Sequence, residues 1–184
     1  LMPGERVAVY LEKRQETVVA CFGTAHAGGL FVPINPILRA EQVGHILNDC
    51  AVTVLVTSAA RLDSLEATLA NCPTLRHIVL TDDVSTHAAH PAWSALMAEA
   101  SDTVSPSPTF SAADAPRDTN AVAVFYTSGS TGKPKGVVIS HRNFLIGAQS
   151  VAHYLENRPD DRLLAALPRS EEHTSELQSR YVIS

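Results

Sequence analysis

One short stretch of the sequence contains many side chains that could bind an anion. It reads F-Y-T-S-G-S-T-G-K-P-K-G-V-V, at residues 125–138. Its hydroxyl groups can each donate a hydrogen bond to an anionic oxygen, and Lys133 and Lys135 add positive charge. Those hydroxyl groups belong to Thr127, Ser128, Ser130 and Thr131. The stretch therefore predicts a loop that binds a polyphosphate, most simply the tail of ATP.

Glycine supports the same interpretation, because it lets the backbone turn tightly and bring its N–H groups close to a ligand. We expect this of Gly129, Gly132 and Gly136. Apolar strands are predicted on both sides of the loop, at Ala121–Tyr126 and Val137–Ile139. A solvated Ser/Gly-rich hairpin turn is the alternative. The crowding of hydroxyl groups and the two apolar strands argue against it.

The spacing excludes two common nucleotide-binding motifs. The P-loop of many NTPases has four residues between its glycines and a Ser or Thr after its lysine. Here Ser130 and Thr131 alone separate Gly129 from Gly132, and Pro134 follows Lys133. The dinucleotide-binding pattern G-x-G-x-x-G is not matched either.

The run resembles the signature T-S-G-[ST]-T-G-x-P-K-G of the AMP-forming adenylate synthetases. This superfamily contains acyl-CoA ligases, luciferases and peptide-synthetase adenylation domains. Residues 127–136 match every fixed position, with Lys133 at the free one. The resemblance implies that the β- and γ-phosphates are wrapped by Thr127, Ser128, Gly129, Ser130, Thr131 and Lys135, with Gly132, Lys133 and Gly136 completing the cofactor-binding set. Lys135 is expected to be the main cation and the catalytic residue, and Lys133 is the weaker candidate.

The family also implies a two-step reaction. A small-molecule carboxylate attacks the α-phosphorus of ATP, giving an acyl-adenylate and pyrophosphate, and a thiol then takes the acyl group. The loop would hold the departing pyrophosphate and offset its growing charge. ATP follows from the loop itself, whereas Mg²⁺ and coenzyme A follow from the resemblance alone.

Three further stretches resemble one subgroup, the acyl-CoA ligases associated with exosortase A systems of bacteria. They are P-G-E-R-V-A-V-Y-L-E-K-R, A-G-G-L-F-V-P-I-N-P and D-R-L-L-A-A-L-P. An adenylation domain of a peptide synthetase is the alternative, and its final acceptor would be a carrier protein. A phosphate-binding module without catalysis is a third possibility from a different class.

Strand and helix patterns alternate along the first 80 residues, which favours crossover units and a mostly parallel sheet with helices on both faces. We predict strands at Arg6–Leu11, Leu30–Val32, Val52–Val56 and His77–Leu80, and helices at Arg14–Ala27, Ala40–Asp49 and Arg61–Ala70. Beyond them we predict a short helix at Ala92–Ala100, a helix at His141–Leu155 capped by Ser140, and a strand at Arg162–Leu167. The fold class is α/β.

Two of these helices carry apolar residues that we expect to be buried. In Arg14–Ala27 they are Val18, Val19, Cys21, Phe22 and Ala25. In His141–Leu155 the inner face is expected to consist of Phe144, Ala148, Val151 and Leu155. His141 itself is expected to have a structural or capping role, because no partner that would orient a catalytic base is visible.

Composition bounds the class of protein. With 45% hydrophobic and 18% charged residues, the chain is globular, and its net charge of −5 gives no reason to expect a nucleic-acid partner. No apolar run approaches a membrane span. The cysteines form no C-x-x-C pair and the histidines show no ligand spacing, so we predict reduced thiols in the cytoplasm and no metal site. The oligomeric state is left open.

The last residues change in character. From Arg169, R-S-E-E-H-T-S-E-L-Q-S resembles a translated DNA-sequencing adapter. We therefore expect residues 1–168 to be a partial N-terminal AMP-binding (adenylation) domain and residues 169–184 a non-native tail. The segments that would stack adenine, bind ribose and form the C-terminal lid domain are not in the sequence. The fragment itself is expected to be inactive.

Overall fold

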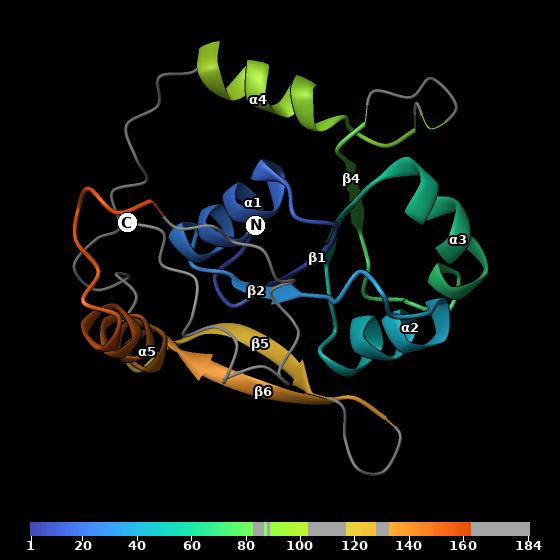
Figure 1. Cartoon of the computed structure of the whole chain (residues 1–184). Coiled ribbons are helices and arrows are strands. Elements are labelled where there is room, and N and C mark those ends of the chain that lie inside the picture. The colour runs from blue at the N-terminus through green and yellow to red at the C-terminus, as the bar shows by residue number, and fades with distance from the viewer. Residues whose placement is uncertain (83–86, 88, 103–116, 128–132, 163–184) are drawn as a thin grey trace.

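A six-stranded sheet forms the centre of the molecule (Figure 1). The computed structural model describes residues 1–82, 87, 89–102, 117–127 and 133–162. The strand order is β4-β3-β1-β2-β5-β6, and every neighbouring pair is parallel except β5 and β6. The strands are β1 (Arg6–Tyr10), β2 (Leu30–Pro33), β3 (Val54–Thr57), β4 (His77–Leu80), β5 (Ala121–Thr127) and β6 (Lys135–Ser140). The predicted mostly parallel α/β sheet is confirmed.

The inner strands are buried on both faces because each carries a run of consecutive apolar residues, with polar residues only at the strand ends. In β1, Val7 and Val9 point into one apolar cluster, whereas Ala8 and Tyr10 point into the other. Side chains alternate across a strand, so one continuous run supplies both layers of the core. The predicted strand at Arg6–Leu11 is confirmed to within one residue.

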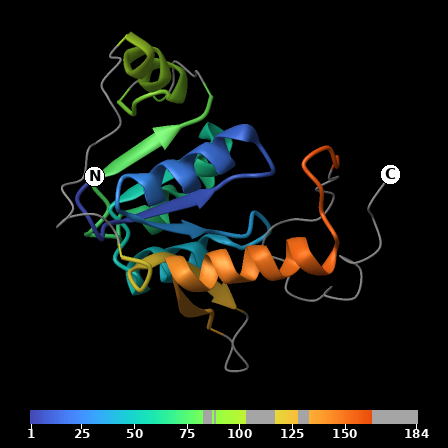
Figure 2. The same ribbon diagram turned by 90° about the vertical axis from the view of Figure 1, so that its left-hand side faces the viewer.

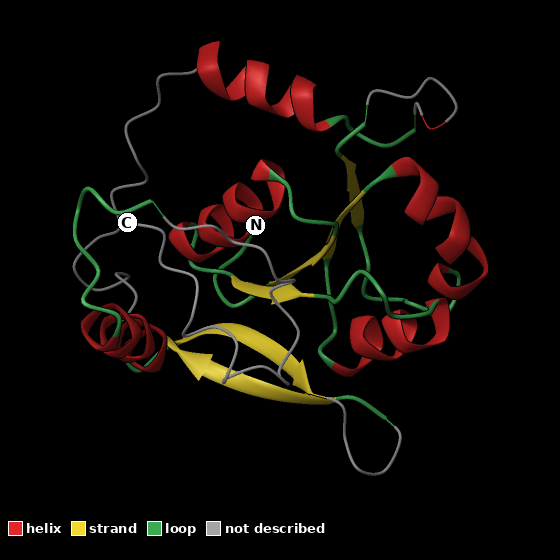
Figure 3. Ribbon diagram, viewed as in Figure 1, coloured by secondary structure: helices red, strands yellow, loops and turns green. Residues whose placement is uncertain are grey.

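Helices cover both faces of this sheet (Figure 3). They are α1 (Gln15–His26), α2 (Ala40–Asp49), α3 (Ala59–Leu69), α4 (Trp93–Asp102) and α5 (His141–Tyr154). The cluster that contains Ala8 and Tyr10 takes its helical residues from α2 and α3. The opposite cluster takes Ala20 and Cys21 from α1, with Phe144 of α5 packed against it. Figure 2 shows α1 and α5 from the side, with both helices running along the sheet.

Helix α1 is less buried than the sequence predicts. Val18, Val19 and Phe22 are 39%, 46% and 49% exposed, so their predicted burial is wrong. The buried face is instead made of Thr17, Ala20, Cys21 and Thr24, spaced at i, i+3, i+4 and i+7. The two threonines can be buried because their hydroxyls donate to the carbonyls of Glu12 and Ala20, at 2.9 and 2.7 Å.

Helix α5 begins where it is predicted to begin. The hydroxyl of Ser140 accepts a hydrogen bond from the N–H of Asn143 at 3.2 Å, which confirms the predicted cap. The predicted inner face is wrong in part, because no residue of α5 is fully buried and Val151 is 56% exposed. Phe144 does reach the core, where its ring meets that of Phe31 edge-on with the centroids 5.8 Å apart.

The remaining boundaries agree closely with the predictions. Helix α2 has the predicted bounds, and Gly28, with a φ of +78°, ends α1 in the left-handed region that favours glycine. Helices α3 and α4 are each displaced by one or two residues. Within the part of the chain that the structure describes, none of the helices is long and apolar enough to cross a lipid bilayer. The strand predicted at Arg162–Leu167 falls almost wholly outside the described residues.

Candidate functional site

The predicted phosphate loop joins β5 to β6, the antiparallel pair at one edge of the sheet (Figure 1). Thr127, the last residue of β5, is paired with Lys135, the first residue of β6. The structure thus places both at the mouth of the hairpin. The predicted residues Ser128, Gly129, Ser130, Thr131 and Gly132 lie outside the described residues. Thr127, Lys133, Lys135 and Gly136 can be located.

The two lysines of the loop are both exposed. Among the described residues, the side chains of Lys133 and Lys135 make no hydrogen bond or ion pair. Their ammonium groups are therefore not neutralised by the described carboxylates. A group that is not already paired within the fold is free to meet an anionic ligand.

Gly136 plays a different part from the one predicted for it. It lies within β6 rather than in a tight turn, opposite Tyr126 of β5. A Cβ atom at Gly136 would stand 3.1 Å from Cζ of Tyr126 and 3.1 Å from Cγ1 of Val124. The absence of a side chain thus leaves room for the tyrosine ring, which is the physical reason for glycine at this position.

Tyr126 is the residue immediately before the loop, and its side chain is fixed. Its hydroxyl donates to Oδ2 of Asp49, the last residue of α2, at 2.6 Å. Partial burial raises the pKa of Tyr126 well above its ordinary value, and the hydrogen bond to Asp49 raises it further. The phenol therefore stays protonated and remains a donor to the carboxylate.

A second contact joins α2 to the far end of the loop. Nε2 of His45 lies 3.1 Å from the carbonyl oxygen of Pro134. A carbonyl can only accept, so the imidazole N–H donates. The sequence offered no signal for His45 or Asp49, since their partners are 89 and 77 residues away along the chain. His45 and Asp49 are therefore residues of the site that could not be predicted from the sequence.

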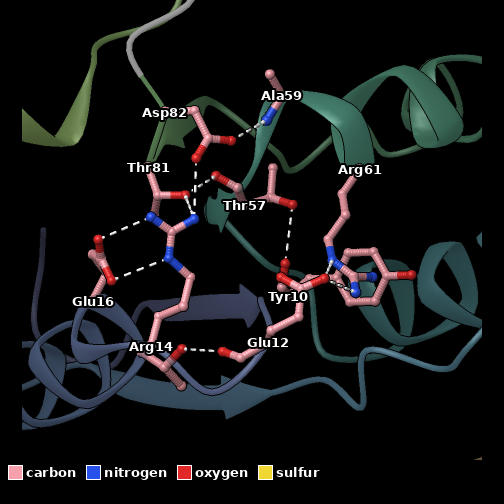
Figure 4. A network of polar contacts seen from close by, with 10 residues as sticks. Tyr10, Glu12, Arg14, Glu16, Thr57, Ala59, Arg61, Thr81 and Asp82 are labelled. Carbon is pink, nitrogen blue, oxygen red and sulfur yellow. Dashed lines mark hydrogen bonds and ion pairs between the residues drawn. The ribbon is translucent and has the colours of Figure 1, made fainter.

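A second polar cluster lies at the carboxyl ends of β1, β3 and β4 (Figure 4). Ligands of open parallel sheets usually bind at this edge. Here Arg14 donates to Thr81 and Asp82 through Nη1, at 3.2 and 3.0 Å, and to Glu16 through Nη2 at 3.1 Å. Partial burial opposes the ionisation of Asp82, but hydrogen bonds from Arg14 and from the N–H of Ala59 outweigh it and lower its pKa.

The neighbouring part of the cluster is equally self-contained (Figure 4). The guanidinium of Arg61 lies 4.4 Å from the ring centroid of Tyr10, pairs with Glu12, and donates to the carbonyl of Pro36 at 2.9 Å. The hydrogen bond from Arg61 lowers the pKa of Glu12. Because Arg14 and Arg61 are each already paired with a carboxylate, the cluster ties loops together and neither arginine is left to bind a ligand.

The described residues contain no cluster of side chains that could bind a metal ion. No group of three or more His, Cys, Asp or Glu residues there is placed to hold a metal ion. Nε2 of His87 lies 3.0 Å from a carboxylate oxygen of Asp63. His141 is the first residue of α5, and its backbone N–H donates to the carbonyl of Asn120 at 3.0 Å. The site is therefore defined by the β5–β6 hairpin and by the α2 residues that contact it.

Similar proteins include CoA ligases. The crotonobetaine/carnitine–CoA ligase of Salmonella paratyphi A is 34% identical over 167 residues, which cover 90% of this chain and 31% of the ligase. The chain thus spans about a third of the length of the curated relatives it matches.

Solved structures show the same fold. The anthranilate CoA ligase AuaEII, in complex with anthranoyl-AMP, has a TM-score of 0.69 at 28% identity, over 81% of this chain and 27% of that one. The N-terminal domain of FACL13 from Mycobacterium tuberculosis has a TM-score of 0.74 at 28% identity, over 91% and 39% of the two chains. The family model for AMP-binding enzymes matches residues 1–171, and the chain belongs to this family.

Proposed function

We propose that the chain is part of an AMP-forming acyl-CoA ligase, which activates a carboxylate with ATP and passes the acyl group to coenzyme A. The observation that carries this proposal is the match of residues 127–136 to the adenylate-synthetase signature, on a hairpin at the edge of a parallel sheet. Membership of the AMP-binding family and the CoA ligases among its relatives support it. The same relatives favour coenzyme A over a carrier protein as acceptor.

In this proposal the hairpin binds the β- and γ-phosphates of ATP. Thr127 supplies a hydroxyl from the end of β5, and the exposed ammonium of Lys135 supplies the charge. Lys133 is the second cation, and Ser128, Ser130 and Thr131 complete the hydroxyl set, with backbone N–H groups at Gly129, Gly132 and Gly136. These donors would stabilise the charge that develops on departing pyrophosphate.

Mg²⁺ is proposed only as the counter-ion that ATP brings, because the described residues provide no cluster for it. We also propose three further assignments that the sequence suggests. These are an exosortase-associated subgroup, a cytoplasmic location, and a boundary at Pro168 with an adapter-derived tail beyond it. The source DNA tests the boundary: a natural open reading frame through residues 169–184 would refute it.

Titration calorimetry with ATP and with inorganic pyrophosphate tests the phosphate site directly. We expect both to bind, and Lys135→Ala to weaken binding by about tenfold or more, since a charge-assisted hydrogen bond is worth about 1.5–3 kcal/mol. Arg158→Ala is the matched control, because it also removes one exposed positive charge, at a position that follows α5 and lies outside the hairpin. Equal affinity in wild type and Lys135→Ala would refute the role of this lysine.

We further propose that the 184-residue chain does not catalyse ATP–pyrophosphate exchange, because the adenine-binding and lid segments of the family are not in its sequence. Exchange assays with a panel of carboxylates check this. Carboxylate-dependent exchange that is lost in Lys135→Ala would overturn the claim of inactivity, yet would support the assignment of the loop.

A further inference from the structure

Helix α2 contacts the predicted phosphate loop at both of its ends. The residues from Thr127 to Lys133 are bounded by Tyr126 before them and Pro134 after them. Tyr126 donates its hydroxyl to Asp49 at 2.6 Å, and Pro134 accepts a hydrogen bond from His45 at 3.1 Å. The two contacts therefore bracket residues 127–133, the first part of the signature, and Lys135 follows directly after the second contact.

One face of one helix supplies both contacts. His45 and Asp49 are four residues apart in α2, and residues at this spacing lie one above the other on a helix surface. Another face of the same turns buries Val43, Ile46 and Leu47 in the core without exposure to solvent. Core packing thus holds α2 in place without the two contacts.

The hairpin needs such a support at this end. The ladder between β2 and β5 pairs Phe31 with Ala123, and no described pair continues it to Tyr126. Beyond Ala123 the backbone of β5 pairs with β6, which is itself an edge strand with four exposed residues at its start. Strand β5 is also held by Val124, which is buried in the same core cluster as α2, whereas β6 has no further described strand beside it. The contacts to Tyr126 and Pro134 therefore act where the hairpin extends beyond its pairing with β2.

The chemistry of Asp49 is consistent with a role outside its own helix. It is the last residue of α2, where the helix dipole disfavours a negative charge. The hydroxyl of Tyr126 compensates that charge by donating to it. Gly136 completes the arrangement, because a side chain there would press on the tyrosine ring.

We propose that His45 and Asp49 are positioning residues, which hold the two ends of the phosphate loop at a fixed place against α2. If the loop binds phosphate, as the proposed function says, loss of either contact should weaken that binding. This part of the inference rests on the proposed function. The contacts themselves do not depend on the ligand.

The first experiment measures the contacts without ligand. Amide hydrogen exchange is followed by mass spectrometry in the full chain, in peptides that cover residues 127–136. We expect faster exchange there in Tyr126→Phe, Asp49→Ala and His45→Ala, with core peptides of β1 unchanged. Glu41→Ala, which removes a carboxylate from the first turn of the same helix, is the matched control. Unchanged exchange in all three variants would overturn the proposal.

The second experiment measures the consequence, with inorganic pyrophosphate as the probe. Each of the three variants is expected to bind it about three- to tenfold more weakly, the worth of one hydrogen bond. Asp49→Asn keeps an acceptor for Tyr126 and His45→Gln keeps a donor for Pro134, so both should regain most of the affinity. Tyr126→Phe combined with Asp49→Ala should be no weaker than either change alone.

The outcomes separate the two ideas. If wild type fails to bind pyrophosphate, the proposed function of the loop fails, whereas the exchange data alone decide whether α2 fixes its ends. If wild type binds and the variants bind equally well, the positioning role is refuted although the phosphate site stands. A weakening that tracks a lower melting temperature and is not rescued by Asp49→Asn or His45→Gln would also refute it.

Discussion

The two edges of the sheet use apolar residues in opposite ways. Around β1, β3 and β4, apolar side chains are enclosed between α1 on one face and α2 and α3 on the other. Around β6 and α5 they are largely bare: Val138 is 62% exposed and Leu145 55% exposed. Both edges have regular elements, so secondary structure alone does not tell them apart.

What differs is how each element is held. The helices of the enclosed edge are fixed by side chains from distant segments. The N–H of Ala59 at the start of α3, for example, donates to Asp82 at 3.1 Å. Helix α5 takes its side-chain cap from the adjacent Ser140, and it reaches the core through the ring of Phe144. Exposed apolar faces of this kind typically mark contact surfaces.

The largest expected contrast comes from removing leucine side chains. Leu65→Ala, at a fully buried position of α3, should lower the free energy of unfolding by about 2–5 kcal/mol. Leu145→Ala, on the exposed side of α5, should change it by less than about 0.5 kcal/mol. Urea unfolding of both variants measures the difference. Equal losses would mean that α5 is covered in solution, for example by a second copy of the chain.

The next contrast concerns helix caps. Ser140→Ala should destabilise α5 by about 1 kcal/mol, because it removes the only side-chain cap described for that helix. Ser58→Ala, at the corresponding position before α3, should cost only a few tenths, since Ser58 makes no cap bond and Asp82 serves instead. Circular dichroism during urea unfolding gives both values. A larger loss for Ser58→Ala would contradict the distinction between local and distant capping.

The sequence predicted what depends on neighbouring residues. The bounds of α2 and the cap at Ser140 both rest on contacts within a few positions, and both are confirmed. Burial was predicted less well. Val18 and Val19 look like core residues in a helix, but whether they are covered depends on what packs against that face.

In the candidate site, too, features that depend on neighbouring residues were predicted and contacts between distant residues were not. A local motif located the hairpin and its lysines, whereas the Tyr126–Asp49 contact joins residues 77 positions apart and has no local pattern. Gly136 was expected to serve a turn, yet its partner is a ring across the ladder. Contacts of this kind become visible only once the register of β5 and β6 is known.

The smallest expected contrast is electrostatic and depends on pH. A hydrogen bond from its own backbone N–H, and then the contact with Arg14, lower the pKa of Glu16 below its ordinary value of 4.5. Partial burial opposes the ionisation of Asp82, but hydrogen bonds from Arg14 and from the N–H of Ala59 outweigh it and lower its pKa below the ordinary value of 3.8. A carboxyl group whose pKa is lower in the folded state stabilises the fold above its unfolded pKa, and this contribution is lost as the pH falls through the folded value. The pairs are about a third exposed, so we expect Arg14→Met to cost about 0.5–1 kcal/mol at pH 7.

Acid should remove this difference. As the pH falls below these ordinary values and through the lower folded pKa values, both carboxylates of wild type become protonated, so its stability should fall toward that of Arg14→Met. Adding 0.5 M salt at pH 7 should narrow the difference in stability as well. Arg158→Met, at an exposed position after α5, should match wild type throughout. A gap that persists unchanged in acid would show that Arg14 acts by packing its aliphatic stem, and the enclosed edge would then owe its stability to apolar contacts alone.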